Sequence, residues 1–301
     1  MAVEDPPAPT VRTVALPSRG SGETAFLDFG PADRPVDAVF LHANGFNALT
    51  YRHILTPLAM RYRILVPDQR GHGATSLETT VEGRRDWLDM RDDLLAFLHA
   101  LNLRDVVLVG HSMGATASLL AAAVDPACCR SLVLFDPVMP PPRPWGASAE
   151  PGIVQAARRR RAVFPSREDA LSSYRGRGAF STWPEPILAD YVAAGFRDLP
   201  DGQVSLACTP AWEASSYAAQ EQDSWGALGG SRCPIDILRA ESASTFHPSG
   251  SLEDLGDRVR ITTVPGTTHF LPMERPDLVQ SALVQSIEAP VIPKPRTSIP
   301  A

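Results

Sequence analysis

The segment Gly110-His111-Ser112-Met113-Gly114 places one serine between two glycines, directly between a predicted strand and a predicted helix. Residues 106–109 before it are all apolar, as a strand buried on both faces of a parallel sheet must be. Residues 115–124 after it are mostly small and apolar and predict a helix. So sharp a turn crowds its central residue, and side chains at the flanking glycines would collide. The pattern therefore predicts that the Ser112 hydroxyl is held above a sheet, at a helix N-terminus whose dipole favours a developing anion.

The rest of the chain repeats this alternation of short apolar runs and longer helical segments. Apolar runs predict strands at 36–42, 62–67, 105–110, 131–135, 235–238 and 259–264. Apolar residues at three-to-four spacing, or a continuous small apolar run, predict helices at 87–101, 113–124 and 276–287. Strands that alternate with helices in this way predict an α/β protein with a mostly parallel central sheet and helices on its faces.

A segment in the middle of the chain interrupts this alternation of strands and helices. Residues 137–230 begin with a proline-rich stretch, contain several tryptophans and show no convincing buried strand. An insertion between two core strands accounts for this, and some of its tryptophans are expected to form the roof of a pocket. The prediction is a core at 11–137 and 231–288, a mostly helical cap at 138–230, and flexible tails at 1–10 and 289–301.

Charge and composition exclude several classes of protein. A formal net charge of −6 argues against a general binder of nucleic acid or of anionic membranes. The four arginines at 158–161 are interpreted as a solvated face of a cap helix. No apolar run reaches the length of about eighteen residues that a membrane span needs.

The cysteines and the absence of cofactor motifs narrow the prediction further. Four cysteines without a CxxC pair make neither a disulfide scaffold nor a zinc site, which favours a reducing, cytoplasmic location. The chain contains no Walker loop, dinucleotide fingerprint or metal-ligand cluster. We therefore expect no cofactor and no metal, a small molecule as the partner, and leave the oligomeric state open.

A serine needs a base before it can act as a nucleophile, and His269 stands where a base is expected. It lies just after the last predicted strand and before the last predicted helix. Loops at the carboxyl ends of parallel strands carry the functional groups of an open α/β sheet. The order of a serine, then an acid, then a late histidine is the order expected for a catalytic triad around this turn.

With these motifs the chain resembles the α/β-hydrolase superfamily over residues 20–137 and 231–288. The resemblance also includes the segment 42–46, with Ala43 where the family usually has glycine, and the segment 68–73, interpreted as structural. It implies the α/β-hydrolase fold with an inserted lid, and an oxyanion hole formed by two backbone N–H groups. By position these belong to Asn44 and Met113, and their neighbours Phe46 and His111 are expected to contact substrate.

The resemblance leaves two positions open for the acid of the triad. The family most often carries it after the seventh strand, where Glu241 stands one or two positions earlier than the usual aspartate. A subset, which includes haloalkane dehalogenases and some lactonases, carries it after the sixth strand. Asp136 lies there, 24 positions after Ser112. We prefer Asp136, with Glu241 as the alternative, and a chain that uses neither stays possible.

These residues predict a cofactor-free serine hydrolase that cleaves a carboxylic ester or lactone of a small, largely apolar substrate through an acyl-enzyme. Relatives that use aspartate as nucleophile, such as the dehalogenases, are excluded by Ser112. Two alternatives remain. The same triad serves C–C bond hydrolysis of a diketone or cofactor-free perhydrolysis, and some members of the fold only bind ligands.

Overall fold

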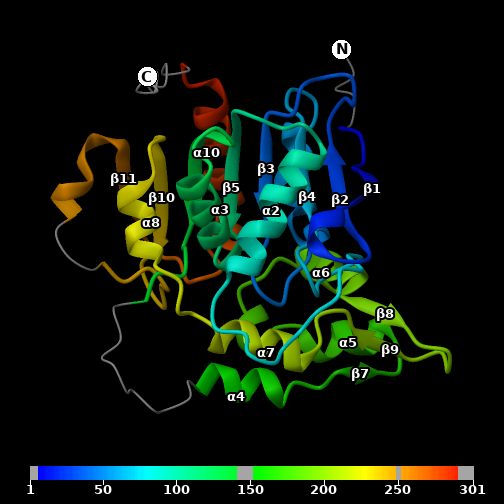
Figure 1. Ribbon diagram of the computed structural model, residues 1–301. Helices are drawn as coiled ribbons and strands as arrows, with labels where there is room; N and C mark the ends of the chain where they lie inside the picture. The colour runs from blue at the N-terminus through cyan, green and yellow to red at the C-terminus, as the bar shows by residue number, and fades with distance from the viewer. Residues whose placement is uncertain (1–5, 141–151, 249–251, 291–301) are drawn as a thin grey trace.

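An eight-stranded sheet forms the centre of the computed structural model, which describes residues 6–140, 152–248 and 252–290 (Figure 1). The strands lie in the order β1-β2-β4-β3-β5-β6-β10-β11. β2 is antiparallel to both of its neighbours, and every other neighbouring pair is parallel. The strands are β1 (Thr10–Ala15), β2 (Glu23–Phe29), β3 (Ala38–Leu41), β4 (Ile64–Pro67), β5 (Val106–His111), β6 (Cys129–Phe135), β10 (Ile235–Ala240) and β11 (Val259–Val264).

Successive residues of the central strands enter two separate hydrophobic cores. On β5, Val107 and Val109 lie in one core and Leu108 lies in the other, because side chains alternate along a strand. Helices α1 (Arg52–Leu55) and α10 (Pro276–Glu288) close the first core. The second is closed by α2 (Leu88–Ala100), α3 (Met113–Val124) and α8 (Ser224–Gly230) (Figure 1). Burial on both faces explains why the strand sequences are continuously apolar.

The predicted α/β class is confirmed, and the predicted core strands and helices lie within a few residues of their predicted ends. The prediction missed β1 and β2. β1 is exposed along most of its length, so it shows no buried apolar run. Thr10 begins β1, which shortens the predicted first tail by one residue. Residues 1–5 and 291–301 of the two predicted tails lie outside the described residues.

Of the segment predicted as a cap, residues 152–218, from α4 to α7, are called the cap here, and they are less helical than predicted. It contains a three-stranded antiparallel sheet, whose strands have only two or three residues and therefore leave no periodic signal in the sequence. Helix α8 packs against α3 of the core, although the predicted cap segment extended to residue 230. The cap elements are α4 (Gly152–Arg158), β7 (Val163–Phe164), α5 (Arg167–Tyr174), α6 (Glu185–Ala194), β8 (Phe196–Asp198), β9 (Val204–Leu206) and α7 (Pro210–Ala218).

Short helical turns complete the described structure. Helix α9 (Leu271–Glu274) lies directly before α10. Turns of 3-10 helix lie at Pro17–Arg19, Ala48–Tyr51, Thr56–Leu58, Gly178–Phe180 and Leu252–Arg258. No helix in the described ranges is both long and apolar enough to cross a membrane.

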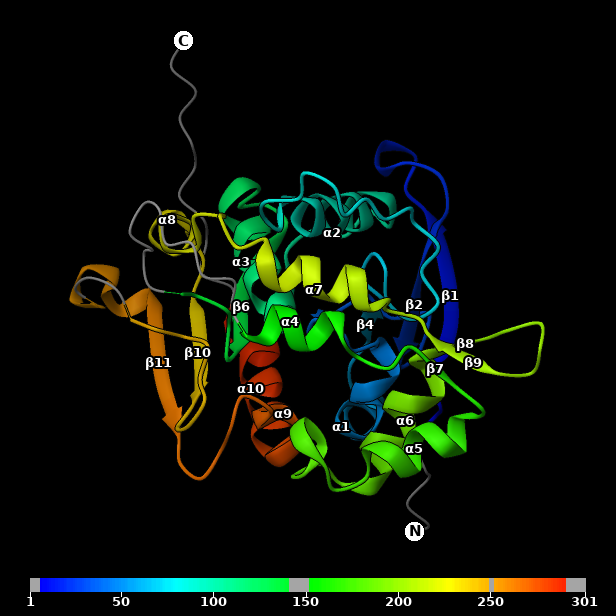
Figure 2. The ribbon, with the colours of Figure 1, turned by 90° about the horizontal axis from the view of Figure 1, so that it is seen from below.

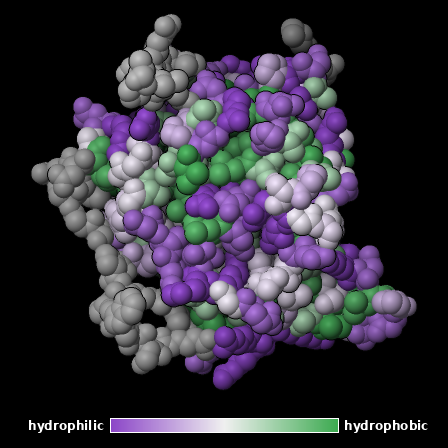
Figure 3. Space-filling view, viewed as in Figure 1, coloured by the Kyte–Doolittle hydropathy of each residue, from purple (hydrophilic) through white to green (hydrophobic). Residues whose placement is uncertain are grey.

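The cap lies across the edge of the sheet where the parallel strands end (Figures 1 and 2). Helices α4 and α7 lie side by side in it, and α6 packs against the turn Ala48–Tyr51 of the core. Figure 3 shows hydrophobic residues gathered over the core and also at places on the cap, among hydrophilic ones. Ile153 and Val163 of the cap are exposed, whereas larger apolar side chains such as Trp183 are buried.

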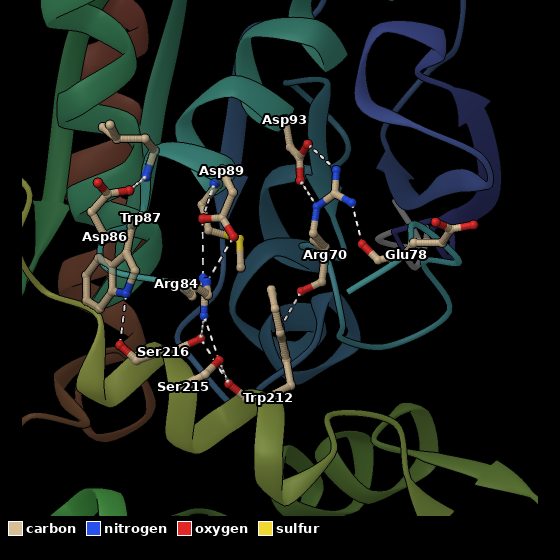
Figure 4. A network of polar contacts seen from close by, with 12 residues as sticks. Arg70, Glu78, Arg84, Asp86, Trp87, Asp89, Asp93, Trp212, Ser215 and Ser216 are labelled. Atoms are coloured by element: carbon tan, nitrogen blue, oxygen red, sulfur yellow. Dashed lines mark hydrogen bonds and ion pairs between the residues drawn. The ribbon is translucent and has the colours of Figure 1, made fainter. Parts of the chain in front are cut away.

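Polar contacts join α7 to the core (Figure 4). Arg84 forms an ion pair with Asp89 of α2 and donates a hydrogen bond to the hydroxyl of Ser216 on α7. Its guanidinium also lies 4.1 Å from the centre of the Trp212 ring. The indole N–H of Trp212 donates to the carbonyl of Arg70, at 2.9 Å. These contacts hold α7 against the loop after β4 and against the segment that precedes α2.

Candidate active site

Ser112 lies in the sharp turn between β5 and α3. Its backbone has φ 56° and ψ −121°, a region that residues other than glycine rarely adopt. A Cβ at Gly110 would lie 2.4 Å from the nitrogen of Ala115, and one at Gly114 would lie 2.4 Å from the carbonyl oxygen of Leu41. The turn therefore needs both glycines, for the steric reason that the sequence indicated.

The structure brings Ser112, His269 and Asp136 together at the carboxyl edge of the sheet. Asp136 follows β6 directly, and His269 lies in the loop between β11 and α9. Nε2 of His269 lies 2.9 Å from Oγ of Ser112, and Nδ1 lies 2.6 Å from Oδ2 of Asp136. A carboxylate, an imidazole and a hydroxyl in this order have the geometry by which a base is oriented and a serine is activated.

The loop after β10 holds the Asp136 side chain with hydrogen bonds. The backbone N–H groups of Ala240 and Thr245 each donate to it at 2.9 Å, and the Ser244 hydroxyl donates at 2.5 Å. Burial alone would raise the pKa of Asp136, but the hydrogen bond and charge of His269, with the hydrogen bonds from Ser244 and Thr245, lower that pKa to about 2. Asp136 is therefore ionised at neutral pH.

Glu241, the alternative acid, points elsewhere. Its side chain is exposed, and its Oε2 accepts a hydrogen bond from the N–H of Gly266 at 2.9 Å. The residues near the usual acid position, Ser244 and Thr245, instead hydrogen-bond the carboxylate of Asp136. Of the two candidate carboxylates, Asp136 contacts the imidazole of His269.

His111 is placed differently from the prediction that it contacts substrate. The side chain is fully buried, and both ring nitrogens have protein partners. Burial and the neighbouring His269 lower the pKa of His111 to about 3, so the ring is neutral. Nε2–H donates to the carbonyl of His269 and Nδ1 accepts from the Tyr51 hydroxyl, both at 2.8 Å. His111 therefore holds the backbone of His269 in place.

The loop after β3, residues 43–46, is called the oxyanion loop here. In the described residues no hydrogen bond is made by the backbone N–H of Asn44, or by that of Met113 at the start of α3. The other three N–H groups of the loop are engaged: Ala43 donates to the Tyr51 hydroxyl at 3.2 Å, Gly45 to His72 Nε2 at 2.9 Å, and Phe46 to the Ala43 carbonyl at 3.1 Å.

His72 supports the oxyanion loop from the core side. Burial, chiefly, holds its pKa well below the usual value, so the ring is neutral. Nδ1 lies 2.9 Å from the carbonyl of Arg70 and therefore donates to it, which leaves Nε2 as the acceptor for Gly45. The sequence indicates a structural role for residues 68–73. No sequence pattern indicated that one of them hydrogen-bonds the oxyanion loop.

Aromatic side chains from the core and the cap form a wall beside the triad. The ring of Phe46 lies 5.0 Å from that of Trp183 and 5.7 Å from that of Tyr191. Phe270 follows His269 and stacks on Phe46 at 6.3 Å. Trp183 is thus the cap tryptophan that lies with Phe46. Trp212 and Trp225 pack elsewhere, and Trp145 lies outside the described residues.

The arginine run at 158–161 is only partly a solvated helix face. Arg159 is exposed as predicted, but Arg160 turns into the cap and its side chain is only 19% exposed. There it forms an ion pair with Glu213 of α7 at 2.9 Å and donates to the Tyr191 hydroxyl. The prediction is wrong for Arg160 because its partner, Glu213, is more than fifty residues away in the sequence.

No cluster of three or more His, Cys, Asp or Glu side chains suited to a metal ion is found in the part of the chain that the structure describes. The polar groups at the site form one connected set of hydrogen bonds around Ser112 and His269. A set of this kind is suited to moving a proton between a hydroxyl and an imidazole.

The chain belongs to the alpha/beta hydrolase family, whose model matches residues 38–282. Among curated proteins it is 24% identical over 254 residues to 2-(acetamidomethylene)succinate hydrolase of Mesorhizobium japonicum, which covers 83% of this chain and 87% of that protein. It is 35% identical over 104 residues to a haloalkane dehalogenase of Agrobacterium fabrum, which covers 34% of this chain and 32% of that protein.

Solved structures show the same fold. The crystal structure of E-2-(acetamidomethylene)succinate hydrolase matches with a TM-score of 0.73 and 23% identity, over 93% of this chain and all of that one. A thioesterase domain from the curacin biosynthetic pathway matches with a TM-score of 0.75 and 18% identity, over the same shares. At these identities the likeness is one of fold. The family establishes the chain as a hydrolase of this fold.

Proposed function

We propose that this hydrolase cleaves a carboxylic ester or lactone through an acyl-enzyme, with Ser112 as nucleophile, His269 as base and Asp136 as the acid of the triad. The observation that carries the proposal is the pair of contacts from the His269 ring, 2.9 Å to the Ser112 hydroxyl and 2.6 Å to the Asp136 carboxylate. The ionised Asp136 orients the imidazole and stabilises its charged form.

The proposed reaction has two halves with the same proton carrier. Ser112 Oγ attacks the carbonyl carbon while its proton passes to Nε2 of His269. The alcohol leaves with that proton, and the acyl group stays on Ser112. Water then attacks the acyl group, gives one proton to His269, and the carboxylic acid departs as Ser112 recovers its proton.

The N–H groups of Asn44 and Met113 are the proposed oxyanion hole. Both are free of protein hydrogen bonds among the described residues, while their neighbours in the oxyanion loop are engaged. Met113 also begins α3, whose N-terminus favours negative charge. Loss of one such donor typically costs about 3–4 kcal/mol of transition-state stabilisation.

The proposed substrate is small and largely apolar on its acyl side. The support is the aromatic wall of Phe46, Trp183 and Phe270 beside His269. The curated relatives support hydrolysis in general, since their names specify a succinate derivative in one case and a haloalkane in another. A cytoplasmic location is also a proposal, supported by the absence of any disulfide among the cysteines of the described residues.

A substrate panel tests the proposal. The panel contains p-nitrophenyl esters from acetate to decanoate, a set of lactones, and a diketone whose cleavage breaks a C–C bond. We expect hydrolysis of short and medium esters or lactones by the wild type and none by Ser112→Ala. Turnover of the diketone alone, or equal turnover by Ser112→Ala, contradicts the proposal.

A further inference from the structure

The cap places a carboxylate directly against the oxyanion loop. Glu213 on α7 accepts a hydrogen bond at its backbone carbonyl from Nδ2 of Asn44, at 3.1 Å. Its Oε1 would lie 2.7 Å from a Cβ at Gly45, whose φ of +75° in any case favours glycine. Glu213 is buried, so little water screens its charge.

This position is unfavourable for a bare negative charge. The proposed reaction develops an oxyanion near the N–H of Asn44, one residue from the contact of Glu213 with Gly45. A buried carboxylate there repels the oxyanion and slows its formation. The charge of Glu213 must therefore be balanced if this loop is to stabilise an anion.

Arg160 supplies the balancing charge. One guanidinium nitrogen donates to Oε2 of Glu213 at 2.9 Å, and another donates to the hydroxyls of Tyr191 and Tyr174. Burial works against the charged form, but the neighbouring Tyr191 and Glu213 hold the pKa of Arg160 well above its usual value. Arg160 is thus a fixed cation within the cap.

The other titratable groups around Glu213 do not take over this role. Burial raises the pKa of the Tyr191 and Tyr217 hydroxyls and of the Cys208 thiol, so these groups are neutral, and His72 on the core side is neutral as well. Arg84 is engaged across the junction with Asp89. Arg160, Tyr191 of α6, Tyr217 of α7 and Cys208 interact electrostatically with Glu213. Tyr174 of α5 contacts Arg160, and His72 contacts Gly45 from the core side of the loop.

We propose that Arg160 is a positioning residue for the oxyanion loop, which acts through Glu213 by holding this side chain against Gly45 and cancelling its charge beside the oxyanion hole. The inference rests on the proposed function, because it concerns the stability of the anion formed on Ser112. On this proposal the cap does not only shape the pocket but also affects the rate of the reaction directly.

A charge-balance cycle tests this inference through kcat and KM on the best ester of the panel. Arg160→Met leaves an unpaired carboxylate, and we expect kcat to fall by roughly 30-fold with KM changed by less than about threefold. Glu213→Gln leaves a cation beside the oxyanion, so kcat should stay within about threefold of wild type. The double variant Arg160→Met/Glu213→Gln is neutral again and should recover to within about fivefold.

Two further variants separate charge from packing. Arg160→Lys keeps the cation and should retain more of kcat than Arg160→Met. Arg159→Met removes the exposed arginine that precedes Arg160 and should leave both kcat and KM unchanged. Thermal unfolding of each variant reports whether it is folded. If Arg160→Met does not fold, the double variant and Arg160→Lys carry the test, and a double variant that folds but stays inactive overturns the inference.

The alternative is that the pair serves only to stabilise the cap. In that case Arg160→Met and Glu213→Gln would lower kcat equally, and the double variant would be worse than either. That result overturns this inference and leaves the proposed function standing. Absence of Ser112-dependent hydrolysis in the wild type overturns the proposed function, and this inference falls with it.

Discussion

The two sides of the site are held in different ways. On the core side, Ser112, Asp136 and His269 follow strands of one sheet, and hydrogen bonds to or from backbone groups fix their surroundings. On the cap side, Trp183 and Glu213 come from an inserted segment that side-chain contacts such as those of Arg84 join to the core. The reaction geometry thus resides in the sheet, and the pocket depends on the cap. Changes in the core, and loss of the Arg160 charge beside the oxyanion loop, should affect every substrate alike. Changes in the aromatic side chains of the cap should affect substrates differently.

The largest expected effect comes from removing the nucleophile or the base. Ser112→Ala and His269→Ala should each lower kcat by roughly 10⁴- to 10⁶-fold, because the members of a triad act as one unit. The loss should be similar for every ester of the panel. Steady-state kinetics on at least three chain lengths, with thermal unfolding to show an intact fold, measure this. More than a tenth of wild-type activity in either variant contradicts the assignment.

The second expected effect distinguishes the two carboxylates. Asp136→Asn keeps the shape but offers the wrong hydrogen-bonding group to the imidazole, so kcat should fall by about 10⁴-fold, a magnitude taken from serine proteases. Glu241→Gln changes an exposed side chain whose partner is Gly266 and should alter kcat by less than about threefold. If the two losses come out reversed, Glu241 is the acid in solution.

The cap should show a smaller and selective effect. Trp183→Ala removes one ring of the aromatic wall, and we expect kcat/KM for short acyl groups to fall by about tenfold while longer groups lose less or gain. Trp225→Ala is the matched control, since Trp225 packs against Phe246 and away from Phe46. The measurement is the ratio of kcat/KM between butyrate and decanoate esters. An unchanged ratio in Trp183→Ala would place this tryptophan outside the pocket.

The smallest expected effect is on stability at low pH. The folded-state pKa of Asp136, about 2, lies below the value of about 3.9 for an unfolded chain. A lowered pKa stabilises the folded protein above pH 4, and this contribution is lost as the pH falls toward 2. Between pH 6 and pH 3 the wild type should lose about 1 kcal/mol more of its free energy of unfolding than Asp136→Asn. Urea titrations at the two pH values measure this, and equal losses would contradict the ionised state.

The core side of the site could be predicted from sequence because each element leaves a local signal. The glycines around Ser112 are required by the lack of space in the turn, and the apolar runs follow from burial of the strands on two faces. The position of His269 after the last strand indicates that it lies at the carboxyl edge of the sheet. Asp136 could be preferred but not established, because its contact with His269 spans 133 residues. The edge strand β1 was missed because it is exposed.

The cap side could not be predicted in the same way. Arg160 stands in a run of four arginines that looks uniformly solvated, and its burial depends on Glu213, 53 residues later. His111 carries no mark in the sequence that both of its ring nitrogens are engaged. Such contacts are set by packing between distant segments, which local patterns do not encode.

Labelling by a fluorophosphonate tests the central proposal, that Ser112 is an activated nucleophile, most directly. The reagent forms a stable bond to a serine only where a base and an oxyanion hole activate it. Peptide mapping by mass spectrometry should find one adduct, on Ser112, formed quickly in the wild type, slowly in Asp136→Asn and not at all in Ser112→Ala. A folded wild-type protein that takes up no label, or takes it up on another residue, would contradict the proposal.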